Sequence, residues 1–292
     1  MSWRIEFIGL IIVSTLTDYY CGLNIHNFRL EKTKKFFFLL FSLTINLSLL
    51  FLFKYYNFFI DNLNFLFINN SYDYVNFVLP VGISFYTFQT LGYTIDVYRG
   101  TLKPERNIIR FATYVSYFPQ LVAGPIERAK SFLPQLSNSK NLHLGNLKNG
   151  LRIVVWGFFK KMVVADNLAK IVDHIFSIPN ASSLEILIAT YFFAFQIYLD
   201  FSGYTDIAIG TSRMLGIKLR RNFRTPYFSM SIKEFWSRWH ISLSTWFRDY
   251  LFIPMGGSRK SDFRIYLNLI ITFVISGLWH GANWTFFIWG FY

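Results

Sequence analysis

A histidine close to the C-terminal end of the sequence has the surroundings of a catalytic residue. His280 lies in the string SGLWHGANW (residues 276–284), whose small residues leave room for a second backbone or a ligand. An ionisable side chain inside an apolar membrane segment is costly and is a functional hypothesis by default. A neutral imidazole takes a proton from a hydroxyl group readily, because its ordinary pKa lies near neutral pH. A histidine that only packs between helices explains His280 equally well.

A second histidine, His240, lies in an aromatic-rich segment with helical spacing. The pattern predicts one amphipathic helix over residues 231–252, with Ser231 and Glu234 in a capping-box arrangement at its start. His240 falls on the aromatic side of this helix, four residues after Trp236. Considered alone, the motif is more typical of an interfacial helix with a histidine beside its aromatic belt than of a catalytic site.

Two carboxylates, Asp200 and Asp206, interrupt the apolar segment at residues 184–210. Charges in such a segment need partners, and the nearest basic residues in the sequence are those at 213–224. Structural pairing with that basic segment is therefore favoured over direct catalysis. Asp200 is also a candidate for orienting a histidine.

Several patterns of known enzymes are absent from the sequence. The residues five places after the two histidines are Thr245 and Thr285, so the His-x-x-x-x-Asp pattern of glycerolipid acyltransferases is missing. No nucleophile elbow, Walker loop, dinucleotide fingerprint or His-Glu-x-x-His string occurs. The lone cysteine, Cys21, excludes a disulfide framework and a cysteine-built metal site, and we expect no metal. Histidine-assisted group transfer, or no catalysis at all, remains.

The composition is that of a membrane protein. Of the 292 residues, 53% are hydrophobic and 15% are charged, whereas a soluble domain is nearer a quarter charged. The formal net charge of +13 would indicate nucleic acid as a partner of a soluble protein. Here the basic residues lie in short clusters between apolar runs, as in cytoplasmic loops. We therefore expect an all-α, polytopic membrane protein that contacts membrane lipids and no nucleic acid.

The apolar runs predict spans and their orientation. Residues 36–53 form the clearest span, and residues 77–98 are expected to return across the membrane. The positive-inside rule places the basic cluster at 29–35 in the cytoplasm and the asparagine-rich loop at 57–76 outside.

The remaining apolar segments are uneven in length. Residues 7–16 are too few to span, since a span needs about 20 residues. Residues 111–123 suit a re-entrant or surface-lying helix, residues 184–210 are long enough to span, and residues 265–292 form the last apolar stretch. We expect one membrane-embedded domain over residues 1–292.

Six strings follow one another along the chain: QLVAGPIER (120–128), YLDFSGY (198–204), NFRTPY (222–227), FWSRWHISLS (235–244), RDYLFIP (248–254) and GLWHG (277–281). Together they resemble the membrane-bound O-acyltransferase (MBOAT) family. The resemblance is strongest to its bacterial alginate O-acetylation branch, which is related to the D-alanyl transfer proteins of teichoic acid synthesis. It runs from about residue 14 to residue 292.

The resemblance implies a helical ring around a central tunnel, with re-entrant and interfacial helices. A thioester donor, acetyl-CoA or an acyl carrier, would enter from the cytoplasm, and the acceptor hydroxyl from the other side or from within the bilayer. His280 corresponds to the family's catalytic histidine and His240 to its upstream histidine. The expected supporting residues are Asp200, Arg238, Trp279 and Asn283. Family members begin with further helices and continue past residue 292, so this chain is expected to be truncated at both ends.

These observations lead to the hypothesis of an O-acyltransferase in the cytoplasmic membrane. It would move a small acyl group, acetyl, from a thioester to hydroxyls of a cell-envelope polysaccharide or to an extracytoplasmic acetyltransferase partner. The basic residues at 213–224 would attract the phosphates of the donor, although ordinary positive-inside loop charge explains them equally well. The alternatives are a transporter or flippase-like membrane protein without covalent chemistry, and an inactive fragment.

Overall fold

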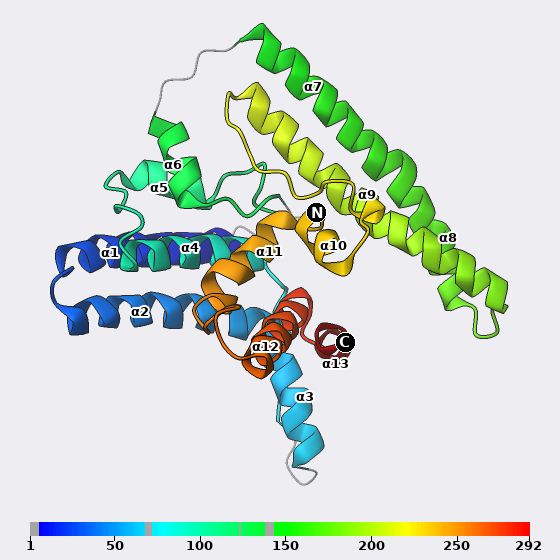
Figure 1. Cartoon of the computed structure of the whole chain (residues 1–292), viewed down its shortest axis with the longest axis horizontal. Helices are drawn as coiled ribbons and strands as arrows, with labels where there is room; N and C mark the ends of the chain where they lie inside the picture. The colour runs from blue at the N-terminus through cyan, green and yellow to red at the C-terminus, as the bar shows by residue number, and fades with distance from the viewer. Residues whose placement is uncertain (1–5, 68–71, 123, 138–142) are drawn as a thin grey trace. The chain divides into compact units, whose positions relative to one another are not determined.

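The computed structural model describes residues 6–67, 72–122, 124–137 and 143–292. In these ranges the chain is helical and forms no strand, as the sequence predicts. The described residues gather into two compact units (Figure 1). The first unit comprises residues up to 117, 128–136 and 243–292, and the second comprises residues 118–127 and 137–242.

The first unit contains a group of three packed helices and a helix pair. The helices α1 (Phe7–Asn27), α2 (Lys32–Leu50) and α4 (Ile83–Tyr98) lie side by side (Figure 1). The pair consists of α12 (Asp262–His280) and α13 (Trp284–Phe291). The other elements with most of their residues in this unit are η1 (Phe51–Tyr55), α3 (Tyr56–Leu66), α5 (Ile108–Val115), α6 (Ala129–Ser137), α11 (Ile241–Phe247) and η4 (Arg248–Phe252).

Four helices in the described part of the chain are long and apolar enough to cross a membrane. They cover Phe7–Asn27, Lys32–Leu66, Ser183–Met214 and Asp262–His280. The two clearest apolar runs of the sequence lie within the second and third of them, so the expectation of an all-α polytopic membrane protein is confirmed.

The expectation that residues 7–16 are too short to span is wrong, because α1 continues to Asn27. Asp18, which interrupts the apolar run, is fully buried. Its carboxylate accepts hydrogen bonds from the Ser42 hydroxyl, the Asn46 amide (2.9 Å) and the Thr94 hydroxyl (2.9 Å). Because α2 and α4 provide these donors, the helix accommodates a carboxylate at membrane depth.

The predicted loop at 57–76 is wrong over its first half, since the helix continues as α3 (Tyr56–Leu66). The Asn57 amide donates to the Val75 carbonyl (2.9 Å), and its oxygen accepts from the Val75 N–H (3.1 Å). Asn57 therefore ties the irregular segment after residue 72 to a helix. The part of the prediction at 68–71 lies outside the described residues.

The predicted span at 77–98 is helical only from Ile83 onward. Pro80 and Gly82 precede this helix, and Gly82 has a φ of 83°, in the left-handed region that favours glycine. Residues 72–80 form no regular secondary structure, a turn at 81–82 leads into the helix, and α4 has 16 residues.

The predicted segments at 111–123 and 265–292 are each interrupted in the structure. In residues 111–123 the helix ends at Val115, where α5 (Ile108–Val115) stops, and Ala123 lies outside the described residues. The last apolar stretch, 265–292, is divided between α12 and α13 by a break directly after His280.

The second unit is built around an antiparallel helix pair. It comprises α7 (Leu144–Phe158), η2 (Phe159–Ala165), α8 (Asp166–Ser177), α9 (Ser183–Met214), η3 (Pro226–Phe228) and α10 (Ile232–Arg238). Four glycines bring α7 and α9 into backbone contact. A Cβ atom on Gly157 would lie 2.7 Å from the Gly203 carbonyl oxygen, and one on Gly150 would lie 2.6 Å from that of Gly210. Small residues at both positions let the two backbones approach closely.

The glycine contact predicts that Gly157→Ala destabilises the second unit. The new Cβ must displace a backbone carbonyl of α9, an overpacking that costs about 1–3 kcal/mol. Thermal unfolding in detergent should show a lower Tm for this variant. Gly145→Ala is the control on the same helix, because a Cβ there meets nothing within 4 Å. Equal melting of both variants would contradict the packing described.

Candidate active site

The helix break that carries His280 is set by close packing of α12 against α13. A Cβ on Gly277 would collide with the carbonyl oxygen of Phe286, and one on Gly290 with that of Phe273. Gly281, directly after the histidine, faces the Phe286 ring in the same way. The glycines expected to leave room for another backbone therefore do so, and α13 folds back on the end of α12.

The His280 side chain is exposed at the last residue of α12. Its ring lies edge-on to two indoles, those of Trp279 (5.0 Å between centroids, 71° between planes) and Trp289 (5.4 Å, 80°). Across the part of the chain that the structure describes, no side chain forms a hydrogen bond with its imidazole. The indoles fix the ring and leave its nitrogen atoms available to a hydroxyl group.

Two of the expected supporting residues flank His280 in the first unit. The Trp279 ring stacks on Phe88, with centroids 5.3 Å apart and an interplanar angle of 14°. The side chain of Asn283 caps α13 by accepting a hydrogen bond from the Thr285 N–H (3.0 Å). Stacking on Phe88 thus holds the Trp279 indole beside the imidazole. Asn283 fixes the turn that follows His280.

The second histidine lies in a break where the sequence predicts a continuous helix. The prediction of one helix over 231–252 is wrong, since α10 ends at Arg238 and α11 begins at Ile241. The chain at 222–224 causes the break by forming backbone hydrogen bonds to it. The Arg224 N–H donates to the Arg238 carbonyl (3.0 Å), and the Ile241 N–H donates to the Asn222 carbonyl (2.9 Å).

His240 occupies this break in a strained conformation. Its φ is 40°, in the left-handed region that residues other than glycine rarely adopt. The side chain is buried, and its ring packs edge-on to Phe201 (4.6 Å, 78°). Such strain persists only where the surrounding structure enforces it and is frequent at functional sites. His240 lies in the second unit and His280 in the first.

The capping prediction at the start of α10 is half right. The Ser231 hydroxyl accepts from the Glu234 N–H (3.1 Å), as expected. The Glu234 carboxylate, however, binds the Met230 N–H (2.8 Å) and the guanidinium of Arg238 (2.5 Å). Arg238 is thereby held along α10, with a further contact to the Thr225 carbonyl (3.5 Å).

The expected pairing of Asp200 and Asp206 with the basic residues at 213–224 is wrong. Asp200 pairs with Lys161 (2.5 Å), and Asp206 pairs with Lys160 (2.6 Å). The antiparallel packing of η2 against α9 brings these two lysines opposite the two carboxylates. The bonds to Asp166 and Asp200 hold the pKa of Lys161 above its usual range. No interaction between Asp200 and a histidine is observed among the described residues.

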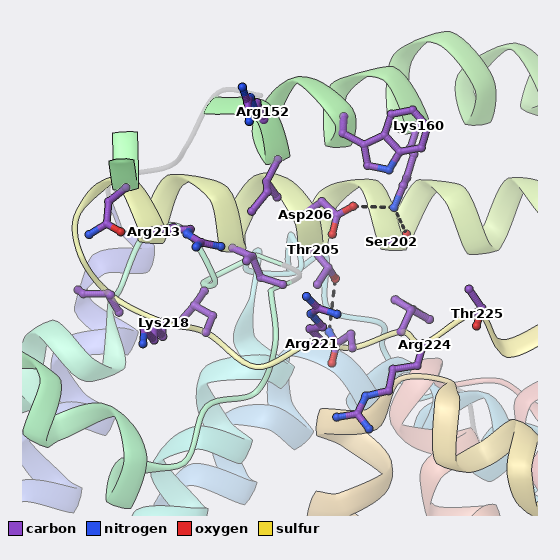
Figure 2. Close-up of a pocket in the computed structure, with 18 of the residues that line it drawn as sticks. Arg152, Lys160, Ser202, Thr205, Asp206, Arg213, Lys218, Arg221, Arg224 and Thr225 are labelled. Atoms are coloured by element: carbon purple, nitrogen blue, oxygen red, sulfur yellow. Dashed lines mark hydrogen bonds and ion pairs between the residues drawn. The ribbon is translucent and has the colours of Figure 1, made fainter. Parts of the chain in front are cut away.

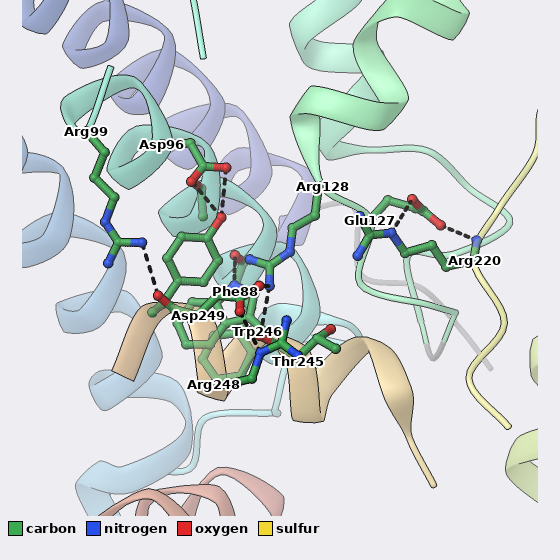
Figure 3. A network of polar contacts seen from close by, with 12 residues as sticks. Phe88, Asp96, Arg99, Glu127, Arg128, Arg220, Thr245, Trp246, Arg248 and Asp249 are labelled. Atoms are coloured by element: carbon green, nitrogen blue, oxygen red, sulfur yellow. Dashed lines mark hydrogen bonds and ion pairs between the residues drawn. The ribbon is translucent and has the colours of Figure 1, made fainter. Parts of the chain in front are cut away.

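A basic pocket of about 970 Å³ opens between α7, α9 and the chain that follows α9 (Figure 2). Its lining includes one carboxylate, Asp206, which is paired with Lys160. Arg220 lies outside the lining and instead contacts the buried carboxylate of Glu127 (3.9 Å; Figure 3). The six basic residues of the lining are Arg152, Lys160, Arg213, Lys218, Arg221 and Arg224.

A polar network in the first unit joins residues of two strings, QLVAGPIER (120–128) and RDYLFIP (248–254). The Arg128 guanidinium lies 3.1 Å from the Asp249 carboxylate and covers the Tyr250 ring at 4.3 Å (Figure 3). The Tyr250 hydroxyl donates to the Asp96 carboxylate (2.8 Å), and Arg99 donates to the Asp249 carbonyl (3.0 Å). These partners are far apart in the sequence, so residue spacing gives no signal for them.

A sequence model of MBOAT, the membrane-bound O-acyltransferase family, matches residues 105–292. The chain belongs to this family. It is 43% identical to the probable alginate O-acetylase AlgI of Azotobacter vinelandii, over 99% of this chain and 58% of that protein. It is 37% identical to the peptidoglycan O-acetyltransferase of Helicobacter pylori, over 99% and 59%. A more distant relative is the teichoic acid D-alanyltransferase of Bacillus subtilis, 31% identical over 74% and 58%.

The comparisons confirm the family and the branch that the sequence strings indicate. The chain spans a little under three fifths of the length of these relatives. The matched range 105–292 includes both histidines and residues of both units. Within the described residues, no group of three or more His, Cys, Asp or Glu side chains is placed to hold a metal ion.

The strained backbone at His240 predicts different outcomes for two substitutions that both remove the imidazole. Asn tolerates the left-handed region, whereas a β-branched residue does not. We expect His240→Val to be less stable to unfolding than His240→Asn by about 1–2 kcal/mol. Thermal unfolding of the two purified variants in one detergent measures the difference. Val as stable as Asn would show that the break does not require this conformation.

Proposed function

We propose that the chain forms the core of an O-acyltransferase that moves acetyl groups from a thioester to hydroxyls of a cell-envelope polysaccharide. The observation that supports this most is the exposed imidazole of His280, held between two indoles in the family string GLWHG. The names of two relatives, an alginate O-acetylase and a peptidoglycan O-acetyltransferase, give acetyl as the group and an envelope polysaccharide as the acceptor class.

In the proposed reaction, a nitrogen of His280 accepts the proton of the acceptor hydroxyl as its oxygen attacks the thioester carbonyl. The tetrahedral intermediate then expels the thiolate, which takes the proton from the imidazolium. The products are an O-acetyl ester and a free thiol. Excluding water from this site favours transfer over hydrolysis.

The other expected residues take positioning roles in this proposal. Trp279 fixes the ring of His280, and Asn283 fixes the turn that follows it. His240, in the break between α10 and α11, orients the donor or the acceptor. Asp200 and Arg238 support the second unit through their ion pairs with Lys161 and Glu234.

The donor in this proposal carries phosphate groups, as acetyl-CoA or the thioester of an acyl carrier does. Support comes from the basic pocket, whose lining has six basic residues and one acidic residue, an excess of five positive charges. Arg152 reaches the pocket from α7, far in sequence from residues 213–224. Ordinary positive-inside loop charge does not require basic side chains from two separate elements to line one pocket.

We further propose that both units belong to one MBOAT domain in the cytoplasmic membrane. The donor would approach from the cytoplasmic side, where the positive-inside rule places the basic segments. The acetyl group would pass on the other side to the polysaccharide or to an extracytoplasmic acetyltransferase. The D-alanyltransferase relative supports a relay only by family likeness.

Replacing His280 with alanine tests the catalytic proposal. General-base catalysis contributes about 100-fold or more, so His280→Ala should reduce polysaccharide-bound acetate to near background. The measurement is acetate released by alkali from the envelope of a host lacking its own O-acetylase. His174→Ala, which removes an exposed histidine on α8, is the control. Acetylation that survives in His280→Ala would overturn the proposal, and flipping or uptake without ester formation would favour a transporter.

Charge reversal in the pocket tests the proposed donor. Arg152→Glu and Arg221→Glu should each raise the KM for acetyl-CoA by about 10-fold or more, since a hydrogen bond to a charged group contributes about 1.5–3 kcal/mol. Acetyl-pantetheine, which lacks phosphates, should show no such increase. Arg259→Glu, an exposed arginine outside the pocket, is the control. Unchanged KM values for acetyl-CoA would show that the basic residues of the pocket are ordinary positive-inside loop charge and do not bind the donor.

A further inference from the structure

A lysine within one of the candidate spans has no role in the chemistry proposed so far. Lys54 lies in η1 (Phe51–Tyr55), a π-helical turn within the candidate span Lys32–Leu66. Single π-helical turns inside α-helices occur frequently at functional sites. An ammonium group in such a segment is costly and requires specific partners.

The partners of this turn lie at the end of the helix that carries His280. The Lys54 ammonium donates to the Trp279 carbonyl and to the Ser84 hydroxyl (3.1 Å). The neighbouring Tyr55 hydroxyl donates to the Leu278 carbonyl (2.9 Å). The two carbonyls belong to the residues that immediately precede His280.

The last carbonyls of a helix lack partners within the helix and carry the negative end of its dipole. In α12, the N–H of Gly281 returns only to the Gly277 carbonyl (3.4 Å). A cation and a phenol from η1 therefore take the place of the helix cap for Leu278 and Trp279. Lys54 also lies 5.6 Å from the centre of the Trp279 ring, the indole that packs against His280.

The same continuous helix reaches the other side of the break. The Trp284 indole N–H, at the start of α13, donates to the Asn62 side-chain oxygen on α3 (2.9 Å). The Phe58 ring, one turn before Asn62, lies edge-on to the Trp284 ring at 5.8 Å. Contacts from Lys54, Tyr55 and Asn62 thus hold both ends of the segment 278–284, with His280 inside it.

We infer that Lys54 and Tyr55 are positioning residues, which cap the end of α12 and so set the orientation of the His280 imidazole for acyl transfer. This inference rests on the proposed function for its catalytic consequence, but its structural part does not. A misplacement of about 1 Å at a catalytic group can cost about 100-fold in rate. Loss of the cap therefore acts on the turnover number and leaves donor binding in place.

Three variants test the inference in the full protein. Lys54→Met removes the ammonium at nearly constant length, Tyr55→Phe removes one hydroxyl, and Lys54→Arg keeps the cation. We expect kcat to fall about 10- to 100-fold in the first and several-fold in the second, with the acetyl-CoA KM within about 2-fold. Lys54→Arg should recover a large part of kcat. The controls are Lys148→Met, an exposed lysine on α7, and Tyr56→Phe, whose hydroxyl has no hydrogen bond to the described residues.

A second readout does not depend on acyl transfer. Modification of His280 by diethyl pyrocarbonate, followed by mass spectrometry, reports how its imidazole is presented. We expect its rate to change about 5-fold or more in Lys54→Met and to remain unchanged at His174. This readout also covers Tyr55→Phe, a mild change that keeps the inference testable if Lys54→Met fails to insert into the membrane.

The outcomes separate the two proposals. An active parent with unchanged kcat and His280 modification in Lys54→Met and Tyr55→Phe overturns the inference and leaves the proposed function intact. A second outcome combines a changed rate of His280 modification in Lys54→Met with acetylation that survives in His280→Ala. It overturns the proposed function and leaves the cap by Lys54 and Tyr55 in place. Equal losses of kcat in Lys54→Met and Lys54→Arg would also overturn the role of the cation.

Discussion

Backbone groups at the end of an apolar helix must find partners inside the protein, and the break after His280 shows how this chain meets that requirement. A helix that ends in apolar sequence exposes carbonyl groups that water cannot reach. In this chain an ammonium and a phenol take that place, and an asparagine binds the helix that follows. A terminal histidine can then point away from the helix with its nitrogen atoms uncommitted. A histidine in the middle of α12 would lie against the neighbouring turns instead.

The same requirement extends to the helices that support this break. Asp18 is buried, none of the described residues forms an ion pair with it, and hydroxyl and amide donors from α2 and α4 stabilise it. The polar residues Ser42, Asn46 and Thr94 in otherwise apolar helices are explained by this carboxylate. The cluster fixes α2 against α1 and α4, and α2 continues directly into the π turn that contacts α12. Contacts thus run from this polar cluster through α2 and the π turn to the two residues before His280.

Much of the fold and part of the site could be predicted from the sequence. Hydropathy located the spans at 36–53 and 184–210, and the string GLWHG located His280, because both signals are local. The length of α1 was not predictable, since it depends on donors from two other helices for Asp18. The helix break at His240 depends on backbone hydrogen bonds to residues 222–224, which have no signature within 231–252.

The ion partners of the carboxylates on α9 show a further limit of sequence reasoning, because helix register decides them. The glycine pairs recur at seven-residue intervals, 150 and 157 on α7 against 210 and 203 on α9, so both pairs fall along one line of contact. Lys160 follows Gly157 by one turn, and this places its ammonium beside Asp206 and the Ser202 hydroxyl (2.8 Å).

This register also determines the charge of the pocket. Asp206 is the carboxylate in the lining, and its pairing with Lys160 neutralises it. The pocket lining opposite the basic residues after α9 therefore carries no unpaired negative charge. The close approach of the glycine-bearing backbones of α7 and α9 brings α7 and the chain after α9 together around this pocket. Basic side chains from both elements would therefore attract an anionic group that enters the pocket.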